Sequence, residues 1–313
     1  MATDDELVTL GADLARKAAD RPSLVTLGCY AQFLAESGDG AKAAETFEAA
    51  LQCARESDGE AILPAMVGAY AYYAGAYAEF LDASGKPAEA EAQYRAALAV
   101  KPDCALCLGN YALFLQNVRK DPSGAEQHYQ RAVSAHPKHA SILTKYANFL
   151  KSVRADHTQA EQFFLRAIDA CPTNPDSLGS YAVFVHSVRH DERTAEEYYE
   201  RAVEADPTHV NNLSNFGLYL SEAKKDYARA EGFYKKCVDL DPAHANSAYN
   251  YAVMLDSGLR DAPRAEEMYR RAIEANPRHA CVCVVLRRTN LPKRTLLVPH
   301  SWPRNASVQV RTL

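Results

Sequence analysis

The sequence predicts an all-α fold, a right-handed superhelical solenoid of about seven helix–turn–helix repeats. The first observation is a proline that recurs every 35 residues between residues 102 and 277 of the 313-residue chain, at positions 102, 137, 172, 207, 242 and 277. The second is an aromatic residue with the same period, each followed by a small residue. A fixed period of this length is the sequence signature of a stacked repeat array. The aromatic positions are Tyr111, Tyr146, Tyr181, Phe216 and Tyr251.

Each repeat reads as two helices joined by a short turn. Leu108, Tyr111, Ala112 and Leu115 are spaced three, one and three residues apart, so they share one face of a first helix. A second periodic set of small and aromatic residues marks the second helix, and the proline ends it. An aspartate in each turn is expected to cap the second helix. These aspartates are Asp121, Asp156, Asp191, Asp226 and Asp261.

The repeats set the expected domain organisation. Residues 1–23 form a capping helix, and the array occupies residues 24–280, with one insertion between its first two repeats. Residues 281–313 form a basic tail outside the pattern, and we expect it to be poorly ordered; a docking tail and a mis-predicted coding segment are alternative interpretations. The segments of the array are 24–57, the insertion 58–70, 71–104, 105–139, 140–174, 175–209, 210–244 and 245–280.

Composition narrows the class of protein. The formal net charge is −5, so no global basic field favours direct nucleic-acid binding. The acidic N-terminus lacks the basic start and apolar core of a secretory signal. Ala61–Ala78 carries no charge, but it is rich in Ala, Gly and Tyr and is interrupted by Pro64, which favours a packed core helix over a membrane span. We therefore expect a cytoplasmic or nuclear protein.

No constellation of residues predicts catalysis, so we expect a protein that is not an enzyme and needs no cofactor. The chain has no Gly-rich phosphate loop and no nucleophile paired with a base. Cys104-x-x-Cys107 lacks a second pair at zinc-site spacing, and Cys281-x-Cys283 lies far away in sequence, so we interpret these cysteines as structural thiols and expect no metal site. Histidines that follow the prolines by two residues are interpreted as helix-start residues.

The repeat positions resemble the tetratricopeptide repeat (TPR) family, whose units carry small, aromatic and proline residues in this order. The resemblance covers roughly residues 24–280. Leucines such as Leu108 and Leu143 stand where the family often has Trp, and the five regular repeats carry one extra residue in the inter-helix turn. The half-a-TPR family of RNA-processing scaffolds is a close competitor. The small residues after the aromatic of each first helix favour the tetratricopeptide family.

The resemblance implies a concave groove lined by the first helices of the repeats. An asparagine amide both donates and accepts hydrogen bonds, so it suits an extended peptide backbone. The pattern resembles the asparagine ladder of a glycosyltransferase in this family, although Lys145 and Ser180 interrupt it; the alternative is that Asn is simply tolerated on an exposed face. The candidate groove residues are Asn110, Lys145, Asn148, Asn211, Asn215, Asn246 and Asn250.

Taken together, these features favour a non-catalytic adaptor or scaffold that binds a protein or peptide partner along its groove. Two other functions stay open at this point: a substrate-recognition subunit of an enzyme complex such as a glycosyltransferase, and an RNA-processing scaffold. A clamp for a chaperone carboxylate is disfavoured because the basic groove residues, Lys145 and Lys151, lie in one repeat.

Overall fold

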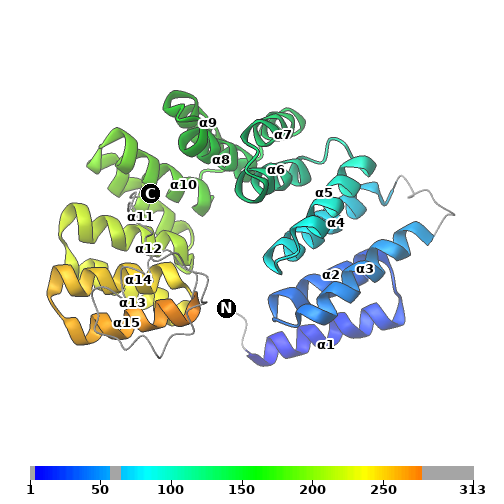
Figure 1. Ribbon diagram of the computed structural model, residues 1–313, viewed down its shortest axis with the longest axis horizontal. Helices are drawn as coiled ribbons and strands as arrows, with labels where there is room; N and C mark the ends of the chain where they lie inside the picture. The colour runs from blue at the N-terminus through cyan, green and yellow to red at the C-terminus, as the bar shows by residue number, and fades with distance from the viewer. Residues whose placement is uncertain (1–3, 57–64, 277–313) are drawn as a thin grey trace, which may run out of the picture. The chain divides into compact units, whose positions relative to one another are not determined.

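The computed structural model describes residues 4–56 and 65–276, and these residues are helical with short turns (Figure 1). No strand occurs in the described ranges, so the predicted all-α repeat fold is confirmed. The chain divides into two compact units, residues 1–170 and 171–313, which are described separately below. The predicted tail and most of the insertion lie outside the described residues.

The first unit holds a leading helix and four helix pairs. In each pair the two helices pack against one another, and α1 packs against α2. The helix α4 begins four residues before the predicted repeat 71–104. The helices are α1 (Asp4–Asp20), α2 (Leu24–Glu36), α3 (Gly40–Glu56), α4 (Val67–Ala83), α5 (Pro87–Val100), α6 (Ala105–Phe114), α7 (Pro122–Ala135), α8 (Ala140–Phe149) and α9 (His157–Ala170).

The second unit holds three helix pairs of the same design. The first helices of its pairs, α10, α12 and α14, also pack against one another in that order. The helices are α10 (Pro175–Phe184), α11 (Glu192–Ala205), α12 (Val210–Tyr219), α13 (Tyr227–Leu240), α14 (Ala245–Val253) and α15 (Ala262–Ala275).

Each first helix of the regular repeats ends in a short π-helical segment. The residue that follows each segment has a left-handed backbone with φ between 53° and 56°. The predicted aspartate then caps the next helix; Asp121, for example, accepts a hydrogen bond of 2.9 Å from the backbone N–H of Gly124. The predicted caps at all five aspartates are confirmed. The segments are Leu115–Arg119, Leu150–Arg154, Val185–Arg189, Leu220–Lys224 and Met254–Leu259.

The core of each unit is a row of small residues and stacked rings. Ala112 and Ala147 are fully buried, which lets helix backbones approach closely. The second-helix aromatic of one repeat stacks on the first-helix aromatic of the next, as in the pair Tyr129–Tyr146, whose centroids lie 5.6 Å apart. In the second unit Tyr234 and Tyr251 stack at 5.5 Å. One repeat therefore completes the core of its neighbour.

No helix of the described residues is long and apolar enough to cross a membrane. The uncharged stretch 61–78 contributes its later residues to α4, whose Tyr70, Tyr73 and Tyr77 are buried in protein. This agrees with the interpretation of that stretch as a packed core helix.

Candidate functional site

The first helices α4, α6 and α8 lie side by side in the first unit and form a continuous face. A pocket of about 220 Å³ opens on this face. Acidic, basic, amide and aromatic side chains line it, so both charged and apolar contacts are available there. Its lining residues are Glu79, Asp82, Ala83, Tyr94, Asn110, Leu113, Phe114, Asn117 and Lys145.

A chain of polar contacts crosses the face at this pocket. The side-chain amide of Asn110 on α6 donates to Glu79 Oε1 on α4. The Lys145 ammonium on α8 donates to the Asn110 carbonyl oxygen. Asn110 therefore uses one of its two N–H donors and one of the two acceptor sites of its oxygen within the protein. A bound peptide backbone can use only the donor and the acceptor site that remain.

The carboxylate of Glu79 lies in an unusual electrostatic setting. Glu79 is exposed by its accessible surface, but the protein packed around it raises the pKa of Glu79 above its ordinary value by partial desolvation, while the charge of Lys145 opposes that rise. Asp82 adds a second carboxylate to the pocket. With both acids ionised, the two carboxylates outweigh the single ammonium and leave the pocket with a net negative charge.

The remaining wall of the pocket is apolar. Tyr94 is buried and stacks on Tyr111 with ring centroids 5.4 Å apart, and Phe114 packs against the same Tyr94 ring at 5.7 Å. Leu113 lies half-buried on α6 beside them. These contacts fix the wall before any ligand arrives, because each ring is held by the aromatic core of the neighbouring repeat.

Sequence reasoning predicted Asn110 and Lys145 but missed Glu79, Asp82 and Tyr94. Glu79 stands two residues after the first-helix aromatic Tyr77, and the predicted groove residue Asn148 stands two residues after Tyr146 in the same way. The register of Asn148 is therefore a sequence signal that points to Glu79. Tyr94 belongs to a second helix, and a rule based on first helices does not reach it.

The other predicted groove residues are distributed over both units. Asn148 is half-buried on α8 of the first unit. In the second unit Asn215 and Asn250 are half-buried at the same register of α12 and α14, while Asn211 and Asn246 are exposed near the starts of those helices. The structure thus brings Asn110 and Lys145 together, whereas the other predicted asparagines lie at separate positions on their helices.

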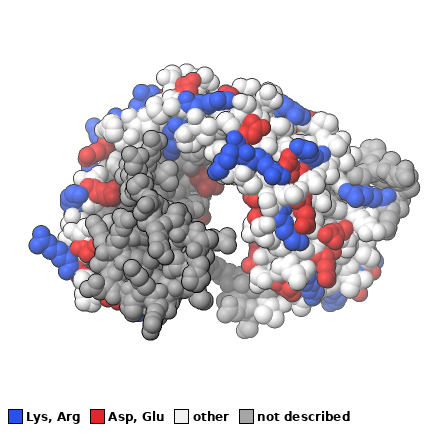
Figure 2. Space-filling view, viewed as in Figure 1, with Lys and Arg blue, Asp and Glu red and all other residues white. Residues whose placement is uncertain are grey.

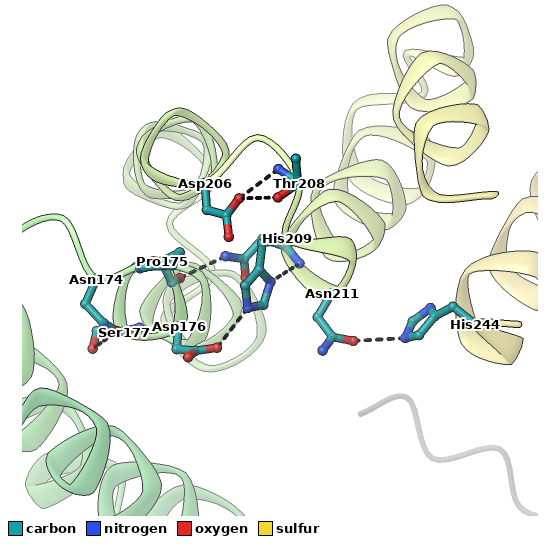
Figure 3. A network of polar contacts seen from close by, with 10 residues as sticks. Asn174, Pro175, Asp176, Ser177, Asp206, Thr208, His209, Asn211 and His244 are labelled. Carbon is teal, nitrogen blue, oxygen red and sulfur yellow. Dashed lines mark hydrogen bonds and ion pairs between the residues drawn. The ribbon is translucent and has the colours of Figure 1, made fainter. Parts of the chain in front are cut away.

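Asn211 takes part in a network at the helix starts of the second unit (Figure 3). Its Oδ1 lies 3.0 Å from Nε2 of His244, and His209 Nε2 lies 3.0 Å from Asp176 Oδ1 one repeat earlier. Each histidine also accepts a hydrogen bond at Nδ1 from the backbone of its own helix, from Asn212 for His209 and from Ser247 for His244. The prediction that these histidines are helix-start residues is confirmed.

Neither the charged side chains of the face in view nor the metal-ligating residue types of the described surface form a concentrated cluster. Figure 2 shows acidic and basic side chains interspersed over the face in view. Within residues 4–56 and 65–276, no three His, Cys, Asp or Glu side chains gather in a way that could hold a metal ion.

Comparison with known protein families finds tetratricopeptide repeats in this chain. The tetratricopeptide repeat family models match residues 81–140, 119–175 and 213–244. A search of curated proteins finds no significant match.

Solved structures with the same repeat fold align with this chain at low sequence identity. A tetratricopeptide repeat protein from Parabacteroides merdae aligns with a TM-score of 0.59 at 16% identity, over 84% of this chain and 97% of its own. The PilF protein of Pseudomonas aeruginosa aligns with a TM-score of 0.52 at 17% identity, over 70% of this chain and 97% of its own. A chain of the Cut9–Hcn1 hetero-tetramer of the APC/C aligns with a TM-score of 0.64 at 13% identity, over 90% of this chain and 52% of its own.

The repeat period, the stacked helix pairs, the family models and these structures agree with one another. The general role of this repeat is to scaffold interactions between proteins. Residues 81–175 and 213–244 of this chain are tetratricopeptide repeats.

Proposed function

We propose that the chain is an adaptor that holds an extended segment of a partner protein against the first helices of its repeats. The pocket formed by Glu79, Asp82, Asn110, Lys145 and Tyr94 accepts one side chain of that segment, which we infer to be a lysine or an arginine. The single observation that carries the proposal is the pocket on the face of α4, α6 and α8, where the carboxylates of Glu79 and Asp82 lie beside an apolar wall.

The chemistry of the pocket favours a cationic side chain with a long apolar stem. Two carboxylates face one ammonium, so a second cation gains attraction that an anion lacks. The half-buried Leu113 and the small exposed parts of the Tyr94 and Phe114 rings supply apolar contacts for the methylene groups of Lys or Arg. The same charges would repel a terminal carboxylate, which supports the expectation that a chaperone carboxylate clamp is not the role of this groove.

The proposal extends along the array in its predicted division into seven repeats. Asn148, Asn211, Asn215, Asn246 and Asn250 remain proposed groove positions, with the half-buried Asn215 and Asn250 as backbone-reading residues of the second unit. An adaptor of this kind need not be catalytic itself. A role as the recognition subunit of an enzyme complex would use the same surface.

A peptide selection tests the proposal. Random peptides displayed on phage are selected against the wild-type protein, and the affinities of the enriched peptides are then measured by fluorescence anisotropy. We expect enriched peptides to share a Lys or Arg, and we expect Glu79→Gln to weaken their binding by about tenfold, as loss of one charge-assisted contact predicts. Glu204→Gln, at an exposed position of α11, is the matched control and should bind like the wild type.

The dependence of affinity on pH adds an independent readout. The pKa of Glu79 is raised by desolvation, so its negative charge is lost at a higher pH than that of an ordinary glutamate. Affinity for a cationic peptide should therefore fall as the pH drops through the raised pKa of Glu79, and this fall should be absent in Glu79→Gln. Enriched peptides without a basic residue, or affinities unchanged in Glu79→Gln, would refute the assignment of the pocket.

A further inference from the structure

The start of helix α6 brings two cysteines together. Cys104 is the N-cap residue of α6 and Cys107 lies in its first turn. Their sulfur atoms are 3.0 Å apart, with the Cys104 thiol donating to Cys107. A closure of about 1 Å would bring the two sulfurs to bonding distance. The sequence predicts structural thiols here, because no second pair stands at zinc-site spacing; the spacing alone does not show that the first helical turn directs both sulfurs to one point.

The two thiols lie in different environments. Cys104 is partly exposed at the positive end of the helix, whereas Cys107 is 1% exposed and its thiol donates to the carbonyl oxygen of Ala71 on α4 at 3.1 Å. The contact between the two thiols is the main cause that lowers the pKa of Cys104 to about 6, and the backbone amides of the first turn and the charge of Lys101 act in the same direction. The contact with Cys104 and burial raise the pKa of Cys107.

The neighbouring helix α4 has a glycine where it faces the buried sulfur of Cys107. Gly75 on α4 faces Cys107, and a β-carbon at Gly75 would come within 3.1 Å of its sulfur. The missing side chain at Gly75 therefore leaves room for Cys107 beside the backbone of α4. The result is an accessible thiol and a buried thiol in contact, which is the arrangement needed for an attacking and a resolving cysteine.

We propose that Cys104 and Cys107 form a redox-active dithiol that closes to an intramolecular disulfide by exchange with a small-molecule disulfide of the glutathione class. The Cys104 thiolate attacks one sulfur of glutathione disulfide, the sulfur–sulfur bond of glutathione disulfide breaks, and one glutathione leaves and takes up the proton that Cys104 released. Cys107 then loses its proton to water and attacks the Cys104 sulfur. The second glutathione leaves and is protonated, so two protein thiols are oxidised and one glutathione disulfide is reduced.

The order of the two attacks follows from the contacts. Cys104 is the accessible thiol, so the glutathione disulfide meets it first. Once Cys104 is joined to glutathione its sulfur carries no negative charge. The charge that had opposed ionisation of Cys107 is then gone. Closing the disulfide removes the thiol proton that Cys107 donates to Ala71, so oxidation alters the contact between α6 and α4. This inference uses none of the pocket residues and does not depend on the proposed peptide binding.

Equilibration of the full chain with mixtures of reduced and oxidised glutathione tests the proposal. The mixture is quenched with acid, free thiols are alkylated, and tryptic peptides are analysed by mass spectrometry. One peptide, residues 96–119, contains both cysteines because trypsin does not cleave between Lys101 and Pro102. We expect this peptide to lose alkylation at both sites and two hydrogen atoms in mass in oxidising mixtures, and to recover fully with dithiothreitol.

Two variants assign the roles, and circular dichroism checks that each stays helical. Cys107→Ser should stop at a stable glutathione adduct on Cys104, and Cys104→Ser should leave Cys107 unmodified. Cys171→Ser, at a partly exposed cysteine far along the chain, is the matched control and should not change the disulfide in peptide 96–119. A wild-type peptide that stays doubly alkylated, or that stops at a glutathione adduct, would overturn the proposal without reference to any variant.

Discussion

At the scale of single residues, the histidines of the second unit show how one residue type serves two neighbouring repeats. His209 accepts a backbone hydrogen bond of its own helix at Nδ1 and contacts Asp176 of the preceding repeat through Nε2. His244 makes the equivalent contact to a neutral partner, Asn211. The carboxylate of Asp176 raises the pKa of His209 above its usual value, whereas burial lowers the pKa of His244. Protonation of His209 therefore stabilises the fold, whereas protonation of His244 destabilises it.

The substitution Asp176→Asn tests this difference. A raised folded-state pKa means that the His209–Asp176 pair stabilises the fold fully below pH 6.5, the unfolded-state value, and that this contribution is lost as the pH rises through the folded pKa. We expect Asp176→Asn to lower the pKa of His209 in an NMR titration and to leave His244 unchanged. The free energy of unfolding should fall by about 0.2–1 kcal/mol more at pH 5 than at pH 8.

We also expect Asp176→Asn to lower the free energy of unfolding by an amount that does not depend on pH. Asp176 lies in the first turn of α10, where its charge favours the positive helix end at any pH at which it is ionised. The informative quantity is therefore the difference between the losses at the two pH values. Equal losses at pH 5 and pH 8, with an unshifted His209 titration, would contradict the assigned pairing.

At the scale of elements, the extra residue of the regular repeats has a structural explanation. Repeats of ordinary length turn through a glycine with positive φ, Gly38 after α2 and Gly85 after α4. The longer repeats instead end the first helix in a π-helical segment, and the next residue adopts the left-handed conformation although it carries a β-carbon. These residues are Lys120, Ala155, His190, Lys225 and Arg260.

The substitution Ala155→Gly tests the strain at this position. Ala155 has φ of 53° and ψ of 25°, a region that costs an L-residue about 1–2 kcal/mol and costs glycine nothing. Part of this gain is offset because glycine is more flexible in the unfolded chain. We expect Ala155→Gly to raise the free energy of unfolding by about 0.5–1 kcal/mol in urea denaturation.

The matched control is the same substitution inside a helix. Ala92 is exposed in the middle of α5, so Ala92→Gly should lower stability by about 1 kcal/mol. Destabilisation of similar size by both substitutions would show that position 155 carries no strain.

Sequence reasoning predicted the elements better than the contacts between them. The small and aromatic positions have side chains whose size alone decides the packing, so Ala112, Ala147 and Tyr129 could be placed in the core by periodicity. Glu126, early in α7, suits the positive end of that helix, but its carboxylate also binds Arg154 of the next repeat at 2.5 Å, which the sequence does not show. Glu79 likewise meets residues of later helices. Such contacts depend on how successive helix pairs stack, and the period alone does not contain that geometry.

At the scale of the whole molecule, contacts between successive repeats stabilise the fold. Within each unit the main packing contacts join helices that are adjacent or next but one in the chain. Ion pairs reach one repeat forward in the same way, from Glu91 to Arg119 in the first unit and from Glu231 to Arg264 in the second. A chain with nearest-neighbour contacts unfolds as a series of coupled segments, so damage in one repeat should weaken its neighbours first.

The substitution Tyr129→Ala tests this locality. The Tyr129 ring is fully buried and lies 5.6 Å from the ring of Tyr146 and 5.4 Å from that of Phe149, so its removal should cost about 3–5 kcal/mol of local stability. Because these rings belong to α7 and the start of the next repeat, amide hydrogen exchange should accelerate in α6, α7 and α8 and stay at the wild-type rate in α14 and α15. Gln127→Ala, at an exposed position of α7, should leave exchange unchanged throughout. Equal acceleration in α14 and α15 would mean that the described repeats unfold as a single cooperative body, and nearest-neighbour coupling would then be too strong to confine the damage.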